Sequence, residues 1–168
     1  MSKKIAMLVE SQFHDTEFFV PYYRMLEAGF DVTIVGPAAN TDYPSKHGEP
    51  VKSEMSASEA KDKEWDAVIV PGGWCPDFLR RYPDVLELIR RVNDKKGIVA
   101  GICHAQSVFI SANILRGVKA TSFFAIKDDV VNAGAEWIDQ EVVIDGNIIT
   151  SRSPQDLPAF CKAIVNAY

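Results

Sequence analysis

The fold is decided by the stretch Gly97-Ile98-Val99-Ala100-Gly101-Ile102-Cys103-His104-Ala105-Gln106-Ser107-Val108-Phe109-Ile110-Ser111-Ala112. Residues 98–102 form a short, almost wholly apolar run, which is typical of a strand buried on both faces of a sheet. From His104 onward, apolar residues recur at helical spacing and would fill one face of a helix. Cys103 lies between the two, where unpaired N–H groups and the positive end of a helix dipole would favour a thiolate. The stretch therefore predicts a buried strand, a turn that carries a nucleophile, and a helix.

Two interpretations of Cys103 follow from this local pattern. In the first, the cysteine is a reactive nucleophile with a depressed pKa, on a turn that resembles the G-x-S-x-G elbow of serine hydrolases. The chain reads Gly101-Ile102-Cys103-His104-Ala105, with Ala in place of the second Gly. In the second, Cys103 is a small buried hydrophobic residue, as most free cysteines are.

Length and composition set limits on the rest of the molecule. The chain has 168 residues, enough for one domain over 1–168 with a full core. The hydrophobic content is 47%, the charged content 24% and the net charge −5, which argues against a nucleic-acid-binding surface. The N-terminal apolar run is too short for a signal peptide or a membrane span, so we expect a cytoplasmic protein without a membrane partner.

The cysteines and histidines give no indication of a metal or cofactor. The three cysteines form neither a CxxC motif nor an even set for disulfides, and Cys75 and Cys161 are interpreted as structural. His14 and His47 are expected in turns, with no other metal ligands grouped around them. We therefore expect no metal and no cofactor.

The order of predicted elements indicates an α/β protein. Strands are expected at 5–9, 31–35, 67–70 and 98–102, with a short β excursion around Val51, and a hairpin at 142–150 turns at Asp145-Gly146-Asn147. A helix with Asp15 or Thr16 as its N-cap is expected to run to about Ala28, and others are expected over 84–95, from 104 to about 113, and at the end of a loop-and-helix segment over 121–132. A last helix is expected after Ser153 as its N-cap, with Asp156 as the acid three residues later. The alternation predicts a three-layer αβα sandwich whose sheet is mostly parallel, with a late antiparallel hairpin.

Several polar groups fall at the carboxyl ends of predicted strands. In open α/β sheets ligands bind at this edge, and Glu10, Gly72-Gly73 and Cys103 all lie at such ends. This convergence favours the reactive interpretation of Cys103.

Four further residues are candidates for the chemistry of a thiol nucleophile, and each has a plainer alternative. His104 is the nearest base, or else a polar surface residue. Gly73 offers a backbone N–H to an oxyanion, or else only makes a tight turn. Glu17 lies in the first turn of a helix, where most glutamates only favour the helix dipole. Asp77 follows the glycine pair, where an exposed loop residue is the alternative.

The chain also resembles the PfpI/ThiJ family of the class I glutamine-amidotransferase-like superfamily. The resemblance covers essentially the whole chain in order. It is carried by Ala100-Gly101-Ile102-Cys103-His104, Ile110-Ser111-Ala112, Phe13-His14-Asp15-Thr16-Glu17, Pro21-Tyr22-Tyr23-Arg24, Lys46-His47-Gly48, Val70-Pro71-Gly72-Gly73, Ile126-Lys127-Asp128-Asp129 and Asn132-Ala133-Gly134-Ala135-Glu136-Trp137.

The resemblance implies a flavodoxin-like sandwich and a set of roles. Cys103 would be the nucleophile at a strained elbow, and Glu17 would hydrogen-bond the thiol and tune its pKa. The backbone amides of Gly73 and His104 would form the oxyanion hole. In the PfpI branch an acid from a neighbouring subunit orients the histidine, and Asp77 occupies that position here. The resemblance thus implies a homo-oligomer, from dimer to hexamer.

This sequence departs from the family at two places. It has Ala105-Gln106 where members usually have Gly-Pro, so we expect a differently shaped pocket floor with a polar Gln106 side chain near it. It has Asp77 where the family more often has Glu, which shortens the reach to His104.

Two functions are compatible with these residues. The first is a cysteine-dependent hydrolase of dicarbonyl-derived adducts or small aldehydes, of the deglycase or glyoxalase type, or of peptides, as an intracellular cysteine peptidase. The second is a non-enzymatic stress-response or redox-sensing protein whose Cys103 is oxidised to a sulfinate. Asp77 and His104 favour the enzyme, because a sensor needs neither.

Overall fold

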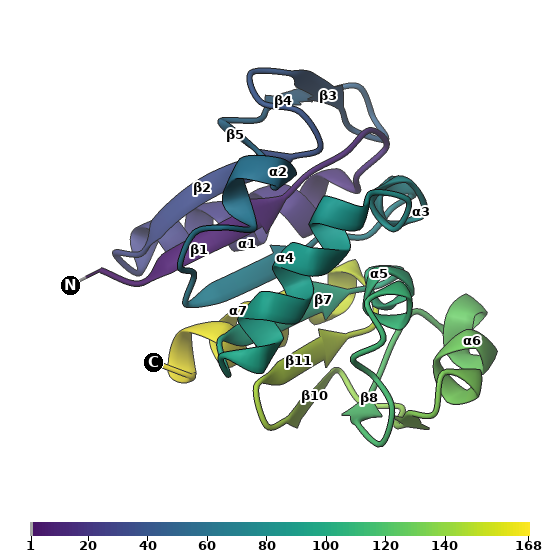
Figure 1. The fold of residues 1–168 in the computed structure, drawn as a ribbon. Helices are drawn as coiled ribbons and strands as arrows, with labels where there is room; N and C mark the ends of the chain where they lie inside the picture. Colours follow the sequence, from purple (N-terminus) through teal and green to yellow (C-terminus); the bar gives the residue numbers. More distant parts are fainter. Residues whose placement is uncertain (1) are drawn as a thin grey trace.

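The structure, a computed structural model, describes residues 2–168 and is built around a seven-stranded sheet (Figure 1). The strand order is β10-β11-β7-β6-β1-β2-β5. The seven strands are β1 (Lys4–Leu8), β2 (Asp31–Gly36), β5 (Met55–Ser56), β6 (Ala67–Val70), β7 (Ile98–Ile102), β10 (Val142–Asp145) and β11 (Ile148–Ser151).

The sheet is parallel except at one edge. β1 pairs with β2 and β6, β7 pairs with β6 and β11, and all these pairs are parallel, whereas β10 pairs antiparallel with β11. Asp145 is opposite Ile148, so a two-residue turn of Gly146 and Asn147 closes the hairpin that the sequence predicts. β6 and β11 are buried along their whole length, as near-continuous apolar runs require.

Helices cover both faces of this sheet, which confirms the predicted three-layer arrangement (Figure 1). On one face α1 packs against α7, and on the other α4 packs against α2 and α5 while α3 packs against α5. The helices are α1 (Asp15–Glu27), α2 (Ala57–Ala60), α3 (Cys75–Leu79), α4 (Pro83–Asp94), α5 (Gln106–Ser111), α6 (Lys127–Asn132) and α7 (Leu157–Asn166).

The helix after Cys103 begins later than the sequence predicts. α5 starts at Gln106 with Ala105 as its N-cap, so His104 precedes the helix. Cys103 has a positive φ of 64°, and the Ala105 N–H donates to the Ile102 carbonyl at 3.1 Å. The chain therefore makes a tight turn between strand and helix, and the thiol lies further from the helix N-terminus than expected.

Two predicted helix caps are also wrong. His14, and neither Asp15 nor Thr16, is the N-cap of α1, and the Asp15 carboxylate instead accepts hydrogen bonds from the Ser45 hydroxyl at 2.5 Å and from the His47 ring at 2.6 Å. Ser153 makes no side-chain cap; it precedes a short 3-10 helix, Pro154–Asp156, which leads into α7.

Some short elements have no clear sequence signal. These are β3 (Asp42–Pro44), β4 (Pro50–Lys52), β8 (Lys119–Ala120), β9 (Glu136–Trp137), the 3-10 helix Phe124–Ile126, and also α2, α3 and β5. Only the β excursion near Val51 was expected among them, and it is present as β4, paired with β3. Two- and three-residue strands are too short for period-2 alternation to identify.

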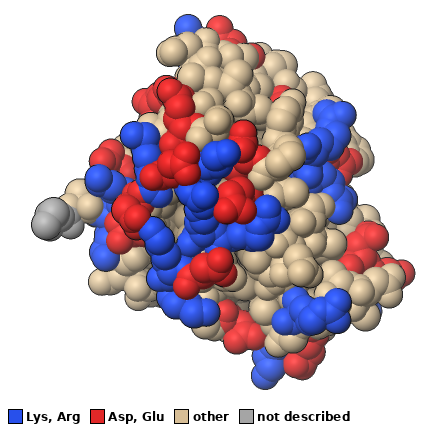
Figure 2. Space-filling model, in the orientation of Figure 1, with Lys and Arg blue, Asp and Glu red and all other residues tan. Residues whose placement is uncertain are grey.

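The face over α2 and α4 carries basic and acidic side chains mixed together (Figure 2). Lys61 pairs with Asp84 at 2.5 Å, and Arg91 pairs with Asp62 at 2.5 Å and Glu87 at 2.9 Å. None of the helices within residues 2–168 is long and apolar enough to cross a membrane.

Candidate active site

Three neighbouring strands bring the candidate residues to one edge of the sheet. β1, β6 and β7 are adjacent and parallel, so their carboxyl ends meet on the side where α3 and α5 lie (Figure 1). Glu17 comes from the first turn of α1, which follows β1. Gly72 and Gly73 follow β6, and Cys103 follows β7. Glu10 also lies here, but its carboxylate accepts hydrogen bonds from the Ser11 amide and the Tyr82 hydroxyl.

The backbone of Cys103 is held on both sides. Its N–H donates to the Ser151 carbonyl at 3.1 Å, and its carbonyl accepts from the Phe123 N–H at 3.0 Å. These bonds tie the turn to the end of β11 and to the segment after β8. A non-glycine residue at φ 64° costs conformational energy, and such strain persists only where the surroundings fix it. The turn is thus a rigid elbow.

Glycine is required at two positions beside the thiol. A Cβ on Gly72 would lie 2.2 Å from Glu17 Oε2 and 2.6 Å from the Cys103 Cβ, so only glycine lets the carboxyl and the cysteine approach each other. Gly73 has a φ of +77°, and a Cβ there would lie 2.5 Å from the Gln12 carbonyl oxygen. The Gly72-Gly73 pair therefore shapes the site with its backbone alone.

The Cys103 sulfur faces donors and a base. His104 Nδ1 is 3.3 Å from the sulfur. The backbone N–H groups of Gly73 and His104 lie close enough to act as donors to it, and they lower the pKa of the thiol. Two backbone donors beside one sulfur are the arrangement that an oxyanion hole would require. Cys103 is 8% exposed, which leaves a narrow opening for a small reagent.

Glu17 is a fully buried carboxyl group without a counter-charge in contact. Burial raises its pKa to about 7; the Cys103 thiol and the Gly72 amide, its nearest hydrogen-bonding groups, lower the pKa only in part. Within residues 2–168 neither carboxylate oxygen has a well-formed hydrogen bond. Glu17 can therefore gain or lose a proton near neutral pH, next to the sulfur.

The depressed pKa expected of Cys103 is not what the structure gives. Burial raises the pKa of this thiol to about 12, and the negative charge of Glu17 adds to the increase. The expectation relied on a helix N-terminus at the sulfur, but α5 begins three residues later. The thiol and Glu17 are coupled, because the charge of ionised Glu17 raises the pKa of the thiol and a proton passed to Glu17 removes that charge.

His104 is positioned by aromatic rings. Its imidazole stacks on Phe123 with ring centres 5.1 Å apart, and it lies 5.7 Å from the Trp74 ring. Burial lowers the pKa of His104, the charge of Asp77 opposes this, and Lys46 lowers the pKa further. The imidazole is therefore neutral at neutral pH and can accept a proton.

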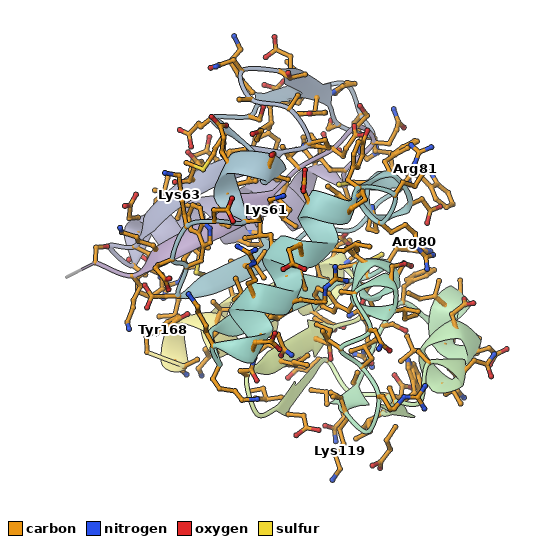
Figure 3. The ribbon with its side chains drawn as sticks, in the orientation of Figure 1. Lys61, Lys63, Arg80, Arg81, Lys119 and Tyr168 are labelled. Atoms are coloured by element: carbon orange, nitrogen blue, oxygen red, sulfur yellow. The ribbon has the colours of Figure 1, made fainter. Side chains whose placement is uncertain are left out.

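Asp77 acts on His104 only through its charge. It lies in the first turn of α3, is exposed, and makes no hydrogen bond to the imidazole within residues 2–168. The surrounding surface holds an exposed Trp74 and a Phe78 ring covered by Arg81 at 4.8 Å. Figure 3 shows Arg80 and Arg81 beside α3 at this end of the molecule.

Comparison with known proteins identifies the family. Residues 3–167 match the family described as DJ-1/PfpI. The chain belongs to the DJ-1/PfpI family. It is 40% identical over 162 residues to "Deglycase PH1704" of Pyrococcus horikoshii, which covers 96% of this chain and 97% of the relative. It is also 40% identical over 166 residues to "Putative cysteine protease YraA" of Bacillus subtilis, covering 99% of this chain and 98% of the relative.

A solved structure supports the same conclusion for the fold. A two-domain protein from Anabaena variabilis, with dj-1/thij/pfpi-like and ferritin-like domains, superposes with a TM-score of 0.96 at 40% identity. The alignment covers 99% of this chain and 48% of that protein, so the present chain spans about half of its length. The predicted resemblance to the PfpI/ThiJ family and the predicted fold class are confirmed.

Gln106, where the sequence departs from the motif of the DJ-1/PfpI resemblance, does not present its polar side chain to the pocket as expected. Its side chain is fully buried, and Nε2 donates to the carbonyls of Gly101 at 3.2 Å and Ser151 at 3.3 Å. It therefore joins the ends of β7 and β11 beneath the elbow. With Gln106 at this position, the carbonyls of Gly101 and Ser151 at the two strand ends both accept a side-chain hydrogen bond.

Two residues near the thiol were not singled out from the sequence. The positive charge of Lys46 lowers the pKa of Glu17 and of His104. The backbone N–H of Lys46 donates to the Phe13 carbonyl at 2.8 Å. Phe123 supports the His104 ring. Lys46 lies in the irregular segment after β3, and Phe123 in the loop after β8, where no periodic pattern marks a functional residue.

The other two cysteines are buried, and the other two histidines lie near each other. Cys75 and Cys161 are buried, and burial raises the pKa of both thiols, to about 11 for Cys161. His47 binds Asp15, and the His14 and His47 rings are 5.8 Å apart. Within residues 2–168 no group of three or more His, Cys, Asp or Glu is arranged to hold a metal ion.

Proposed function

We propose that this protein is a cysteine-dependent hydrolase that acts on dicarbonyl-derived adducts or small aldehydes, in the manner of a deglycase or glyoxalase. The single observation that carries the proposal is the Cys103 elbow. Cys103 has a φ of 64°, and its sulfur faces the Glu17 carboxyl, whose pKa is about 7, and the neutral His104 imidazole at 3.3 Å. Two backbone N–H groups also point to this sulfur. A merely structural cysteine requires none of these groups.

In the first step the Cys103 sulfur attacks the electrophilic carbon of the aldehyde or adduct. The thiol proton passes to Glu17, whose pKa near the working pH suits a general base. The carbonyl electron pair moves to the oxygen, where the amides of Gly73 and His104 stabilise the charge. With a free aldehyde, the proton held by Glu17 is relayed by His104 to this oxygen, which completes the hemithioacetal and restores the Glu17 carboxylate. With an adduct, the proton goes to the amine as its bond to the carbon breaks, and water then releases the remaining group from the sulfur.

The geometry supports the carbonyl substrates better than peptides. A hemithioacetal needs only thiol addition, whereas cleavage of an amide also needs strong protonation of the leaving amine. Among the described residues, 2–168, no carboxylate is hydrogen-bonded to the His104 ring, and burial lowers the pKa of His104. The deglycase name of the Pyrococcus relative supports the first activity, and the cysteine protease name of the Bacillus relative supports a peptidase as the second.

We also propose that the active form is a homo-oligomer in which Asp77 reaches His104 of another copy. Trp74 is 51% exposed beside Asp77, an arrangement typical of a contact surface with an aromatic centre. In the assembled state the carboxylate would orient the imidazole and raise its pKa, which improves proton delivery to the leaving group.

The test is a panel of methylglyoxal, glyoxal-modified amino acids and fluorogenic peptides. The wild-type protein, Cys103→Ala and the matched control Cys161→Ala are compared. We expect turnover of the carbonyl substrates to be lost only in Cys103→Ala. Turnover that persists in Cys103→Ala contradicts the proposal. Absence of turnover in the wild type, with rapid oxidation of Cys103 by mild peroxide, indicates the redox sensor instead.

A further inference from the structure

A small cavity lies directly beside the elbow. It has a volume of about 230 Å³, and its walls are formed by Ser122, Phe123, Phe124, Trp137, Asp139, Arg152 and Ser153. Two of the segments that form its walls are tied to the Cys103 backbone. The Phe123 N–H donates to the Cys103 carbonyl, and the Cys103 N–H donates to the carbonyl of Ser151, the residue before Arg152. The Phe123 ring also stacks on His104. Phe123 therefore separates the cavity from His104, and a ligand in the cavity would reach the Cys103 sulfur by extending past this ring.

The charged group of the cavity is the Arg152 guanidinium, and its two acidic partners differ in kind. Nε and one terminal nitrogen donate to Asp156 at 2.8 and 3.0 Å, and the other terminal nitrogen donates to Asp139 at 2.8 Å. The Asp156 side chain is 7% exposed, whereas that of Asp139 is 69% exposed. Both carboxylates raise the pKa of Arg152, so the guanidinium stays charged.

This asymmetry makes one side of the guanidinium exchangeable. The bidentate pair with the buried Asp156 fixes the orientation of Arg152, because a broken buried pair is costly. The bond to Asp139 is an exposed ion pair, which contributes little and competes with water. An incoming carboxylate can therefore take the place of Asp139 while Arg152 stays in position.

The remaining walls are aromatic and carry a second cation. Phe124 is 72% exposed and packs edge-to-face on Trp137, with ring centres 6.3 Å apart. Lys127 Nζ lies 4.9 Å from the centre of the Trp137 ring. Arg152 and Lys127 face two acids, Asp139 and Asp156, so the group has no net charge, and an anion is accommodated only where it displaces Asp139 from Arg152. The cavity thus suits a ligand that combines an anionic group with an apolar side chain.

We propose that this cavity is a substrate subsite in which Arg152 binds the free α-carboxylate of an amino acid and Phe124 and Trp137 hold its side chain. The inference rests on the proposed function in one respect, namely that Cys103 reacts with the aldehyde-derived carbon of the amino-acid adduct bound in the cavity. It narrows the substrate class to adducts of amino acids, or of peptide C-terminal residues, that carry a free carboxylate.

Binding tests the subsite without any reaction. In Cys103→Ala, dissociation constants are measured by NMR titration for N-acetylphenylalanine and for its amide, which lacks the charge. We expect the acid to bind more tightly than the amide. Adding Asp139→Asn removes the competing carboxylate and should increase this preference by about two- to five-fold, the range that exposed ion pairs support.

The control is Asp94→Asn, which makes the same charge change at an exposed position at the end of α4. It should leave the ratio of the two affinities unchanged. Phe124→Ala, an exposed truncation, should weaken binding of both ligands. Equal affinities for acid and amide, or a ratio that Asp139→Asn does not raise above the Asp94→Asn control, would overturn the subsite.

Kinetics separate this inference from the proposed function. The wild type and Asp139→Asn are assayed on methylglyoxal adducts of phenylalanine and of phenylalaninamide. If both adducts turn over with Cys103 but without preference for the acid, the function stands and the subsite is wrong. If the acid binds preferentially but no adduct turns over, the subsite stands and the function is wrong.

Peptides distinguish the two sources of the carboxylate. N-acetyl-dialanyl-phenylalanine and its C-terminal amide are titrated into Cys103→Ala alongside the single amino acid. Tight binding of the free amino-acid derivative alone assigns the subsite to amino-acid adducts. Equal binding of the peptide acid extends it to peptide C-termini.

Discussion

The two buried carboxyl groups of Glu17 and Asp156 differ in the groups that surround them. Glu17 in α1 and Asp156 before α7 are both almost fully buried, and their helices pack together. Asp156 accepts two hydrogen bonds from Arg152, whereas Glu17 faces a thiol and an amide and has a pKa raised to about 7. A buried acid with a guanidinium serves to hold structure. A buried acid without a counter-charge exchanges a proton near neutral pH and can serve chemistry.

The largest expected effect tests the Glu17 side of this comparison. Glu17→Gln keeps the shape of the side chain but cannot accept the thiol proton. We expect kcat/KM to fall by at least about a hundredfold, the usual contribution of a general base. The measurement is steady-state kinetics on the best substrate of the panel, with circular dichroism to verify the fold. Unchanged kinetics would leave Glu17 with only a helix-dipole role.

The same variant should change the pH dependence of stability. The pKa of Glu17 is 4.5 in the unfolded chain and about 7 in the fold, so the folded state holds the extra proton between these values. Stability therefore falls as pH rises from about 4.5 to about 7. The full loss is about 3 kcal/mol from the difference between the two values. Urea unfolding at pH 5 and pH 8 should show a smaller loss in Glu17→Gln; equal losses would contradict the buried, uncompensated carboxyl.

The Asp156 side is tested by removing the buried partner of Arg152. Asp156→Asn should lower the free energy of unfolding by about 2 kcal/mol, somewhat less than a fully buried pair because Arg152 is partly exposed. Asp139→Asn removes the exposed partner and should cost less than about 1 kcal/mol. Denaturant melts of both variants check the order. If Asp139→Asn lowers the free energy of unfolding as much as Asp156→Asn does, the distinction between the two carboxylates is wrong.

A smaller effect is expected at Asp77, which is neither buried nor paired. Asp77→Asn should reduce kcat about tenfold or less without dissociating the oligomer, because the aromatic contacts remain. Dilution of the wild type should lower specific activity and shift its pH profile to lower pH, since an imidazole without its carboxylate binds a proton less tightly. Light scattering and rates are measured at matched concentrations. Full activity in a diluted monomer would exclude Asp77 of another copy as a partner of His104.

The sheet and the positions of Glu17, Gly73 and Cys103 could be predicted from the sequence for physical reasons. Buried parallel strands are continuous apolar runs, and the turns after them are marked by residues such as Pro71-Gly72-Gly73. Parallel strand ends must meet at one edge, which brings the three residues together.

The electrostatics of the site could not be predicted in the same way. The raised pKa of Cys103 depends on burial and on the exact start of α5, which the apolar spacing of residues 105–112 does not fix. The pairing of Arg152 with Asp156 replaced a predicted helix-capping role for the acid, because Ser153 begins a 3-10 turn. Lys46 is close in space but lies in an irregular segment.

The central claim is that Glu17 takes the proton of Cys103, and one measurement tests it most directly. The rate of Cys103 alkylation by iodoacetamide is followed by mass spectrometry from pH 5 to pH 10 in the wild type and in Glu17→Gln, with Cys161 as the internal reference. In the wild type the rate should rise through a pKa of about 7, that of the Glu17 carboxyl, because only its ionised form can accept the thiol proton. In Glu17→Gln this rise should disappear, and alkylation should increase only at higher pH, where the thiol itself ionises. The same profile in both proteins, or faster alkylation of Cys161 than of Cys103 in the wild type, would contradict the account.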